Sequence, residues 1–208
     1  MSRSLVCISR AWGSGGEDVG RLVAQRLGFL FVDEEIIARA AELGGVDPET
    51  VADAERRKSL FARWLDYLAQ GGAALDATPL PPDWNEHPTE AVREFIRDAI
   101  GEVVERGNAV IVAHAASHAI GADPKALRVL VTASPETRSQ RLSASEGLSD
   151  EEAARTIKSS DTERADYLKR FYGTKEELPT QYDLVVNTDT LSVEQATALI
   201  VLAAAGRR

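Results

Sequence analysis

The amino-acid sequence predicts an α/β fold, with three layers (α/β/α) around a five-stranded parallel sheet. Helix-like and strand-like segments alternate along the 208 residues, and the strand-like segments are short, continuous apolar runs. Strands that are covered on both faces read as unbroken apolar runs, whereas half-exposed strands alternate apolar with polar residues. Alternation of such strands with helices is typical of a parallel sheet.

The N-terminal elements follow from these patterns. SLVCIS, residues 4–9, has no helical period and is predicted to be a buried strand that ends at a glycine cluster. Apolar residues at helical spacing then predict a helix over Glu17–Leu27, which Gly28 can end. FLFVD, residues 29–33, is predicted to be the second strand, and residues 34–43 the second helix.

The C-terminal part continues the alternation. A helix is predicted over residues 89–105, and the runs NAVIVA, ALRVLVTA and YDLVVNT are predicted to be strands three to five. A last helix is expected over residues 192–205. Ligands of parallel α/β folds bind at the carboxyl ends of the strands. The loop SRAWGSGG, the segment after FLFVD, and HAASH would all lie there.

The stretch from residue 50 to residue 88 differs in character from the rest. A charged helix with aromatic residues, SLFARWLDYLAQ, gives way to a loop that carries four of the eight prolines. Such a long connection is typical of an inserted or lid-like segment. Trp64, Tyr67 and Leu68 fit either a core under this insertion or an exposed interface, so a homodimer stays open.

Composition excludes several classes of function. The formal net charge of −9 argues against a general nucleic-acid or membrane-surface binder, because a polyanion would be repelled. No apolar stretch approaches the ~20 residues that cross a bilayer, and the N-terminus lacks a signal-peptide pattern. A cytoplasmic location is therefore expected. The single cysteine, Cys7, excludes an internal disulfide.

The loop SRAWGSGGE has the composition of a phosphate-binding turn. Small residues let backbone N–H groups converge on phosphate oxygens, and a helix N-terminus adds its dipole. The four small residues are Gly13, Ser14, Gly15 and Gly16. Against the pattern G-x-x-x-x-G-K-[ST], Gly16 replaces the lysine, Glu17 the hydroxyl residue and Arg10 the leading glycine. The loop alone also leaves open a tight glycine turn without a ligand.

Three later stretches of the sequence help to decide whether the glycine loop binds phosphate. LRVLVTASPETRSQRL, SDEEAARTIKSSDTERADYLKRFYG and YDLVVNTDTLSVEQATALI together resemble the cytidylate-kinase-like family, relatives of bacterial CMP kinase among the P-loop nucleoside monophosphate kinases. The opening of that family is similar to I-S-R-x-x-G-S-G-G, so the resemblance implies that the missing lysine is a subfamily trait. It runs from about residue 5 to residue 200 and is weakest over residues 50–83.

The resemblance implies a domain organisation and an activity. Residues 1–208 would form one P-loop kinase-like domain, in which residues 50–88 are a helical monophosphate-binding insertion and residues 146–175 a lid-like helical segment. The activity implied is transfer of the γ-phosphoryl group of ATP, with Mg²⁺, to a CMP- or dCMP-type nucleotide. The implied partners are small nucleotide substrates.

The resemblance also implies roles for single residues. Arg10 would replace the missing lysine as a phosphate partner, since a guanidinium matches phosphate geometry. Arg138 and Arg141 would clamp the transferring phosphoryl group, and Asp161 and Arg164 would hold the ribose and phosphate of the acceptor. Each also has a plainer interpretation, a surface arginine for Arg10 and ordinary helix-surface ion pairs for the others.

Two further positions are less distinctive. Asp33 follows the second strand, where it could bind substrate or support Mg²⁺ through water, although it suits the N-cap of the next helix as well.

After the third strand the family has a glycine-arginine-glycine turn, whereas this chain has an alanine on either side of His114. His114 could donate one hydrogen bond to a phosphate or be a histidine satisfied at a strand end. His118 lies four residues on, but two histidines without a third ligand do not predict a zinc site.

The departures from the family pattern leave several functions open. Gly16, Glu17 and His114 stand where a lysine, a hydroxyl residue and an arginine would assist phosphoryl transfer. An active kinase is the first interpretation. A nucleotide-binding protein that has lost transfer is the second, and a kinase for another small acceptor is the third.

Overall fold

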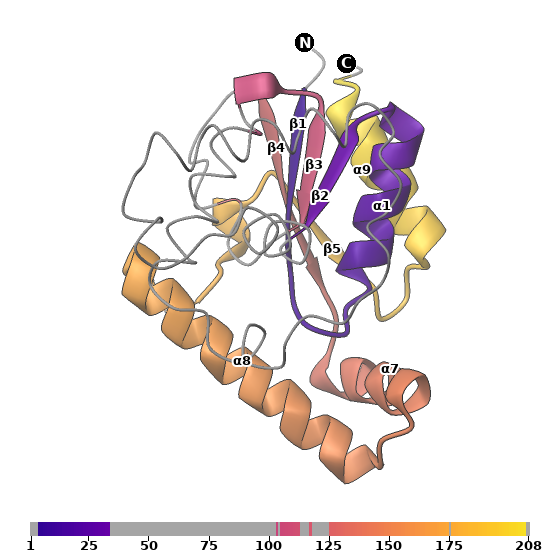
Figure 1. Cartoon of the computed structure of the whole chain (residues 1–208), viewed down its shortest axis with the longest axis vertical. Coiled ribbons are helices and arrows are strands. Elements are labelled where there is room, and N and C mark those ends of the chain that lie inside the picture. Colours follow the sequence, from indigo (N-terminus) through magenta and orange to yellow (C-terminus); the bar gives the residue numbers. More distant parts are fainter. Residues whose placement is uncertain are drawn as a thin grey trace, which may run out of the picture. The chain divides into compact units, whose positions relative to one another are not determined.

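The computed structural model describes residues 4–33, 103, 105–112, 117, 125–174 and 176–206. The elements there are β1 Leu5–Arg10, α1 Gly16–Leu27, β2 Leu30–Asp33, β3 Ala109–Val112, β4 Ala126–Thr132, α7 Pro135–Glu146, α8 Asp150–Tyr172, a 3-10 turn Pro179–Gln181, β5 Leu184–Asn187 and α9 Val193–Ala204 (Figure 1). By its internal contacts the chain divides into two compact units, residues 1–31 with 108–208, and residues 32–107. The predicted second helix and the insertion lie outside the described residues.

The five strands form one sheet in the order β2-β3-β1-β4-β5. Leu5 of β1 lies opposite Ala109 of β3 and Ala126 of β4, and Val129 of β4 lies opposite Leu184 of β5, all in parallel pairings. All six residues of the central strand β1 are buried, the apolar run LVCI as predicted and Ser9 and Arg10 as well. The predicted α/β class and five-stranded parallel sheet are confirmed.

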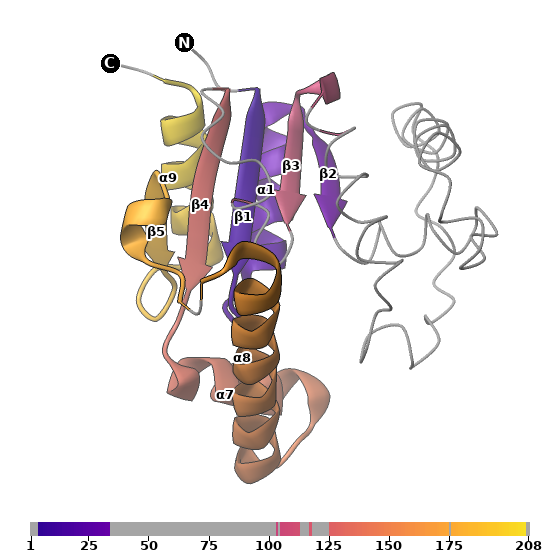
Figure 2. The ribbon, with the colours of Figure 1, turned by 90° about the vertical axis from the view of Figure 1, so that its left-hand side faces the viewer.

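Helices α1 and α9 pack side by side on one face of the sheet (Figure 2). Their buried side chains join those of β1, β3 and β4 in one apolar core. Helix α1 comes very close to the sheet at Gly20, because a Cβ atom there would lie 2.3 Å from Val112 Cγ2 and 3.2 Å from Phe31 Cε2. This close approach sets the path of α1, and with it the position of the loop between β1 and α1.

We expect Gly20→Ala to destabilise the fold, although alanine is the better helix former. Overpacking of this kind costs about 1–3 kcal/mol of unfolding free energy and should lower the melting temperature by roughly 2–4 °C per kcal/mol. Thermal unfolding followed by circular dichroism measures the shift. Gln25→Ala, on the exposed side of the same helix, is the matched control and should leave the melting temperature nearly unchanged. Equal melting temperatures for the two variants would contradict the close packing.

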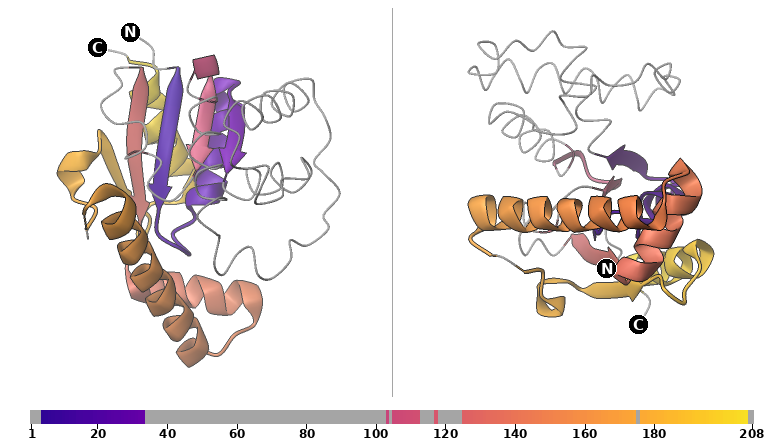
Figure 3. Two further views of the ribbon diagram at one scale, coloured as in Figure 1. Left: turned by 60° about the vertical axis from the view of Figure 1, so that its left-hand side comes forward. Right: turned by 90° about the horizontal axis from the view of Figure 1, so that it is seen from below.

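Helices α7 and α8 lie beyond the carboxyl ends of β1 and β4, as Figure 2 and Figure 3 show. Each begins at a serine N-cap, Ser134 for α7 and Ser149 for α8, whose hydroxyl accepts a hydrogen bond from a first-turn N–H. The two helices pack through a small apolar cluster of Leu142, Ala153 and Ile157. In the described part of the chain, no helix is long and apolar enough to span a membrane.

Candidate phosphate-binding site

The loop between β1 and α1 has the backbone of an anion-binding turn. Gly13 and Gly15 both have a φ of 76°, in the left-handed region that favours glycine. The Ser14 N–H donates to Ala11 O at 3.0 Å, which closes the turn, and α1 begins at Gly16. The first N–H groups of a helix have no partner inside the helix. They are therefore available to an anion at the carboxyl end of β1.

Gly16, which stands where the lysine would be, is a glycine because Arg10 fills the space beside it. A Cβ atom on Gly16 would lie 2.6 Å from Arg10 Cβ and 3.2 Å from Arg10 Cδ. The φ of Gly16 is not in the left-handed region, so close approach and not backbone conformation requires the glycine. The missing lysine and the arginine at residue 10 are thus two parts of one arrangement.

The guanidinium of Arg10 is buried beside the loop. Arg10 is 7% exposed, its Cζ lies 5.5 Å from the centroid of the Trp12 ring, and its Nε is ion-paired with the Glu17 carboxylate. Its Nη1 is buried and has no hydrogen-bond partner among the described residues. A buried cationic donor without a partner, next to free helix N–H groups, fits the phosphate chain of a nucleotide such as ATP.

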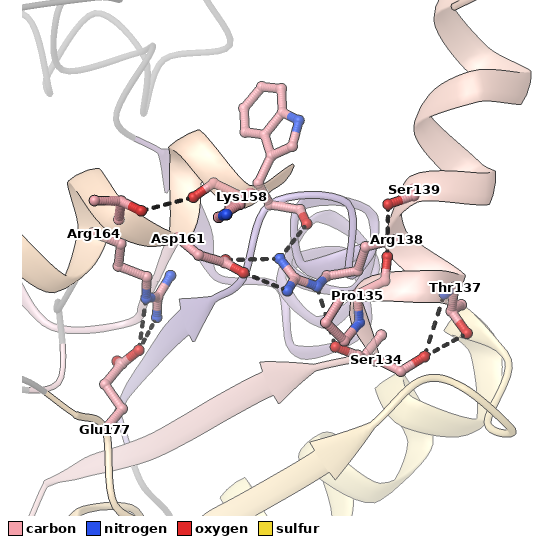
Figure 4. Close-up of polar contacts among 12 residues, drawn as sticks. Ser134, Pro135, Thr137, Arg138, Ser139, Lys158, Asp161, Arg164 and Glu177 are labelled. Carbon is pink, nitrogen blue, oxygen red and sulfur yellow. Dashed lines mark hydrogen bonds and ion pairs between the residues drawn. The ribbon is translucent and has the colours of Figure 1, made fainter. Parts of the chain in front are cut away.

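Arg138 connects the loop to helix α8. It is 4% exposed and donates from Nε to Ala133 O at 3.2 Å and from Nη1 to Trp12 O at 3.3 Å. Its Nη1 and Nη2 also form a bidentate pair with Asp161, at 2.9 and 2.7 Å (Figure 4). Arg138 is therefore paired with a residue of another helix and not with a neighbour on α7, and the pair is buried at the arginine while the Asp161 side chain is 42% exposed.

Arg141, one turn further along α7, reaches the loop from the same side. Its Nη1 donates to Gly13 O at 3.4 Å and to Thr188 Oγ1 at 3.0 Å, and its Nη2 donates to Thr188 O at 2.6 Å. Thr188 is 3% exposed and donates from Oγ1 to Ser14 O at 2.8 Å. Thr188 lies in the stretch YDLVVNTD that carries the family resemblance, but no local pattern marks it as a site residue.

Asp161 and Arg164 share a helix but have different partners. Asp161 is paired with Arg138, whereas Arg164 Nε donates to Glu177 Oε2 at 2.7 Å and Arg164 Nη2 to the same oxygen (Figure 4). Glu177 also accepts from the Tyr182 hydroxyl. Arg164 is 9% exposed, and its Nη1 is buried without a partner in the described part of the structure. Arg164 is therefore, like Arg10, a buried arginine with one N–H donor group that lacks an acceptor among the described residues.

Glu177 and Tyr182 are site residues that the sequence analysis misses. Glu177 lies 13 positions after Arg164, beyond the end of α8, where no helical spacing connects the two. Burial raises the pKa of the Tyr182 phenol above its ordinary value, and the negative charge of Glu177 raises this pKa further, while a hydrogen bond with Ser9 lowers it. The folded protein therefore holds Tyr182 neutral.

The raised pKa predicts a loss of stability at alkaline pH. Above about pH 10 a tyrosine of the unfolded chain ionises while Tyr182 of the folded protein stays protonated, so the unfolding free energy falls as pH rises. Below that pH the stabilisation is complete. Urea unfolding of the wild type and of Tyr182→Phe measures the contribution of the Tyr182 hydroxyl to stability. The unfolding free energy of the wild type minus that of Tyr182→Phe should be constant from pH 7 to 9 and shrink above about pH 10. Parallel curves up to pH 11 would contradict the assignment.

The remaining predicted residues contribute less to the described site. Asp33 ends β2 and is buried, and it belongs with residues 32–107. His114 and His118 lie outside the described residues. Within the described segments, no group of three or more histidine, cysteine, aspartate or glutamate side chains is placed to hold a metal ion.

Solved structures of other proteins are similar to this chain over nearly its whole length. A solved structure of an uncharacterized protein from Eubacterium ventriosum is 18% identical, with a TM-score of 0.63, and the match covers 98% of this chain and 99% of that one. Shikimate kinase from Bacteroides thetaiotaomicron is 16% identical with a TM-score of 0.52, over 96% and 94% of the two chains. At these identities the likeness shows the fold alone, which this chain shares with both proteins.

Sequence comparison adds the family. No curated protein matches the chain. The model of the cytidylate kinase-like family matches residues 5–190, which include the glycine loop, Arg138, Asp161 and Thr188. The chain therefore belongs to the cytidylate kinase-like family.

Proposed function

We propose that the protein transfers the γ-phosphoryl group of ATP to a small phosphorylated acceptor of the CMP or dCMP type. The observation that carries this proposal is the buried guanidinium of Arg10, which lies beside the glycine loop with Nη1 unpartnered. The charge of Arg10 is paired with Glu17, but a buried N–H donor without an acceptor is costly, and a phosphate oxygen would satisfy it. The family and its fold make a nucleotide phosphate the anion that fits best.

In this proposal the loop and Arg10 bind the phosphate chain of ATP. The N–H groups at the start of α1 would hold phosphate oxygens, with the helix dipole in support. Arg10 would supply the positive charge that a lysine supplies in other loops of this kind. Mg²⁺, when bound with ATP, would neutralise negative charge that develops on the phosphates during transfer. Residues 13–17 are the part of the loop that would lie next to this metal–nucleotide complex.

The acceptor would bind on the side of α8. Arg164 has a spare buried donor for the acceptor phosphate, and Asp161 is close by on the same helix. Arg138 is held by Asp161, so this pair would have to open before Arg138 could contact a phosphoryl group.

We further propose that residues 50–88 form the acceptor lobe, with Asp33 and His114 near the acceptor, and that residues 146–175 form a lid. A phosphate oxygen of the acceptor is already a competent nucleophile, so this scheme needs no general base.

A second candidate is a nucleotide-binding protein without transfer. The observation that favours it is the ion pair between Glu17 and Arg10. Glu17 places a carboxylate where a triphosphate would bring more negative charge, and like charges repel unless one of them moves away or is neutralised. In this alternative the protein would bind a nucleotide at the loop but would not turn it over.

A coupled assay of ADP release separates the candidates. Purified protein is given ATP and Mg²⁺ with CMP, dCMP, UMP, AMP, GMP or shikimate in separate reactions, and nucleotide binding is titrated by calorimetry in parallel. Turnover with CMP or dCMP preferred supports the kinase proposal. Turnover only with another acceptor keeps the kinase and changes its substrate. Binding of ATP without turnover supports the second candidate, and absence of both overturns the proposed function.

A further inference from the structure

Three consecutive carbonyl groups of the glycine loop are each held by a side chain. Trp12 O accepts from Arg138 at 3.3 Å and Gly13 O accepts from Arg141 at 3.4 Å. Ser14 O accepts from Thr188 at 2.8 Å. The three donors come from α7 and from the end of β5, far from the loop in sequence. Side-chain to backbone hydrogen bonds between residues so far apart in the sequence require that the tertiary fold hold both partners in place.

Holding the carbonyls fixes the direction of the amides. In a trans peptide the C=O and the following N–H point in opposite directions. A carbonyl of Trp12 that points to Arg138 therefore turns the N–H of Gly13 to the other side, and the bond from Thr188 to Ser14 O does the same for the N–H of Gly15. The loop is thus organised as an anion-binding turn before any anion arrives.

Thr188 is the centre of this arrangement. Its hydroxyl donates to Ser14 O, accepts from Arg141 Nη1 at 3.0 Å, and lies 3.3 Å from Thr132 O. Its own N–H donates to Thr132 O at 2.8 Å, which ties residue 188 to the neighbouring strand β4. The hydroxyl is therefore held rigidly against the sheet.

We propose that Thr188 and Arg141 are positioning residues that preorganise the loop for the phosphate chain, and that Arg141 acts through the loop and not by contact with the transferring group. This inference rests on the proposed function, because it assumes that the loop binds phosphates. Both terminal nitrogens of Arg141 already donate hydrogen bonds, Nη1 to Gly13 O and Thr188 Oγ1, and Nη2 to Thr188 O. Neither residue needs to touch a ligand for its loss to weaken binding.

The test compares Thr188→Val with Thr188→Ser. Valine keeps the volume and removes the hydroxyl, whereas serine keeps the donor. Thr197→Val is the matched control, because the Thr197 hydroxyl is fully buried but donates within α9, to Val193 O at 2.7 Å. Calorimetry with Mg-ATP, and separately with inorganic tripolyphosphate, should show binding about 5–30-fold weaker for Thr188→Val. Thr188→Ser and Thr197→Val should bind nearly as wild type does.

Arg141→Lys is the second variant, in case Thr188→Val folds poorly. It keeps the charge but cannot reproduce the paired contacts with Thr188, so it too should weaken binding of both probes while the KM of the acceptor stays unchanged. Neither variant changes the net charge, so a loss cannot be ascribed to weaker long-range attraction. Wild-type affinity in folded Thr188→Val and Arg141→Lys overturns this inference alone. Wild-type protein that binds neither probe overturns the proposed function, and this inference with it.

Discussion

Replacing Arg10 by alanine is expected to lower turnover by about 100–1000-fold, the range seen when a preorganised donor to a developing anion is removed, or, if there is no turnover, to weaken nucleotide affinity. Arg10 is the cation buried against the loop, and its Nη1 is the donor left for a phosphate. Alanine removes both the charge and the donor. The measurement is kcat and KM for ATP in the coupled assay, with calorimetry for the affinity.

Two comparisons isolate the role of Arg10. Arg155→Ala removes an arginine of the exposed face of α8, whose side chain is 70% exposed, and should leave kinetics and affinity unchanged. Arg10→Lys keeps the charge without the planar fork and should fall between wild type and Arg10→Ala. Far-UV circular dichroism checks that each variant is folded. Undiminished turnover in folded Arg10→Ala would remove Arg10 from the site.

Restoring the lysine of the common phosphate-binding loop is expected to damage this one. In Gly16→Lys the new Cβ would lie 2.6 Å from Arg10 Cβ, and that atom cannot swing away because it is attached directly to the backbone of β1. We expect binding of Mg-ATP to weaken by about 10–100-fold, the equivalent of an overpacking cost of 1–3 kcal/mol. Calorimetry and the melting temperature measure the two consequences.

A double variant separates the clash from the added charge. Arg10→Gly with Gly16→Lys removes the side chain that blocks the lysine, and it should bind Mg-ATP at least about tenfold more tightly than Gly16→Lys alone. Asp18→Asn makes the same one-unit change in net charge at an exposed position of the same helical turn and should keep near-wild-type affinity. If Gly16→Lys binds as wild type does, Arg10 and Gly16 are independent, contrary to the geometry.

The fold could be predicted because it depends on local patterns. Unbroken apolar runs such as LVCI and ALRVLV lie in β1 and β4. The start and stop of α1 follow from glycines at both ends, and the structure places them at Gly16 and Gly28. The order of the strands is not contained in any local pattern, since β1 pairs with β3 and β4 across long connections.

The site could be predicted only in part. The glycine loop was identifiable by composition, and the family resemblance drew attention to Arg10, Arg138 and Arg164. Which partner each arginine has could not be read from the sequence, because Arg138 and Asp161 are 23 positions apart, and Thr188 and Ser14 are 174 apart. Nor did the sequence explain Gly16, because the reason for the glycine lies in the side chain of a residue on the preceding strand.

The contact between Arg10 and Gly16 has a consequence for how such loops can diverge. Starting from this chain, a change at residue 16 alone meets the arginine side chain, and a change at residue 10 alone removes a buried cation with an unsatisfied donor beside the loop. On the predictions above, a route of single changes from this loop to a lysine loop would pass through a variant that binds phosphate more weakly than the starting chain. Positions six apart would then be inherited as a pair, and two lineages of the fold would stay separate even under the same selection.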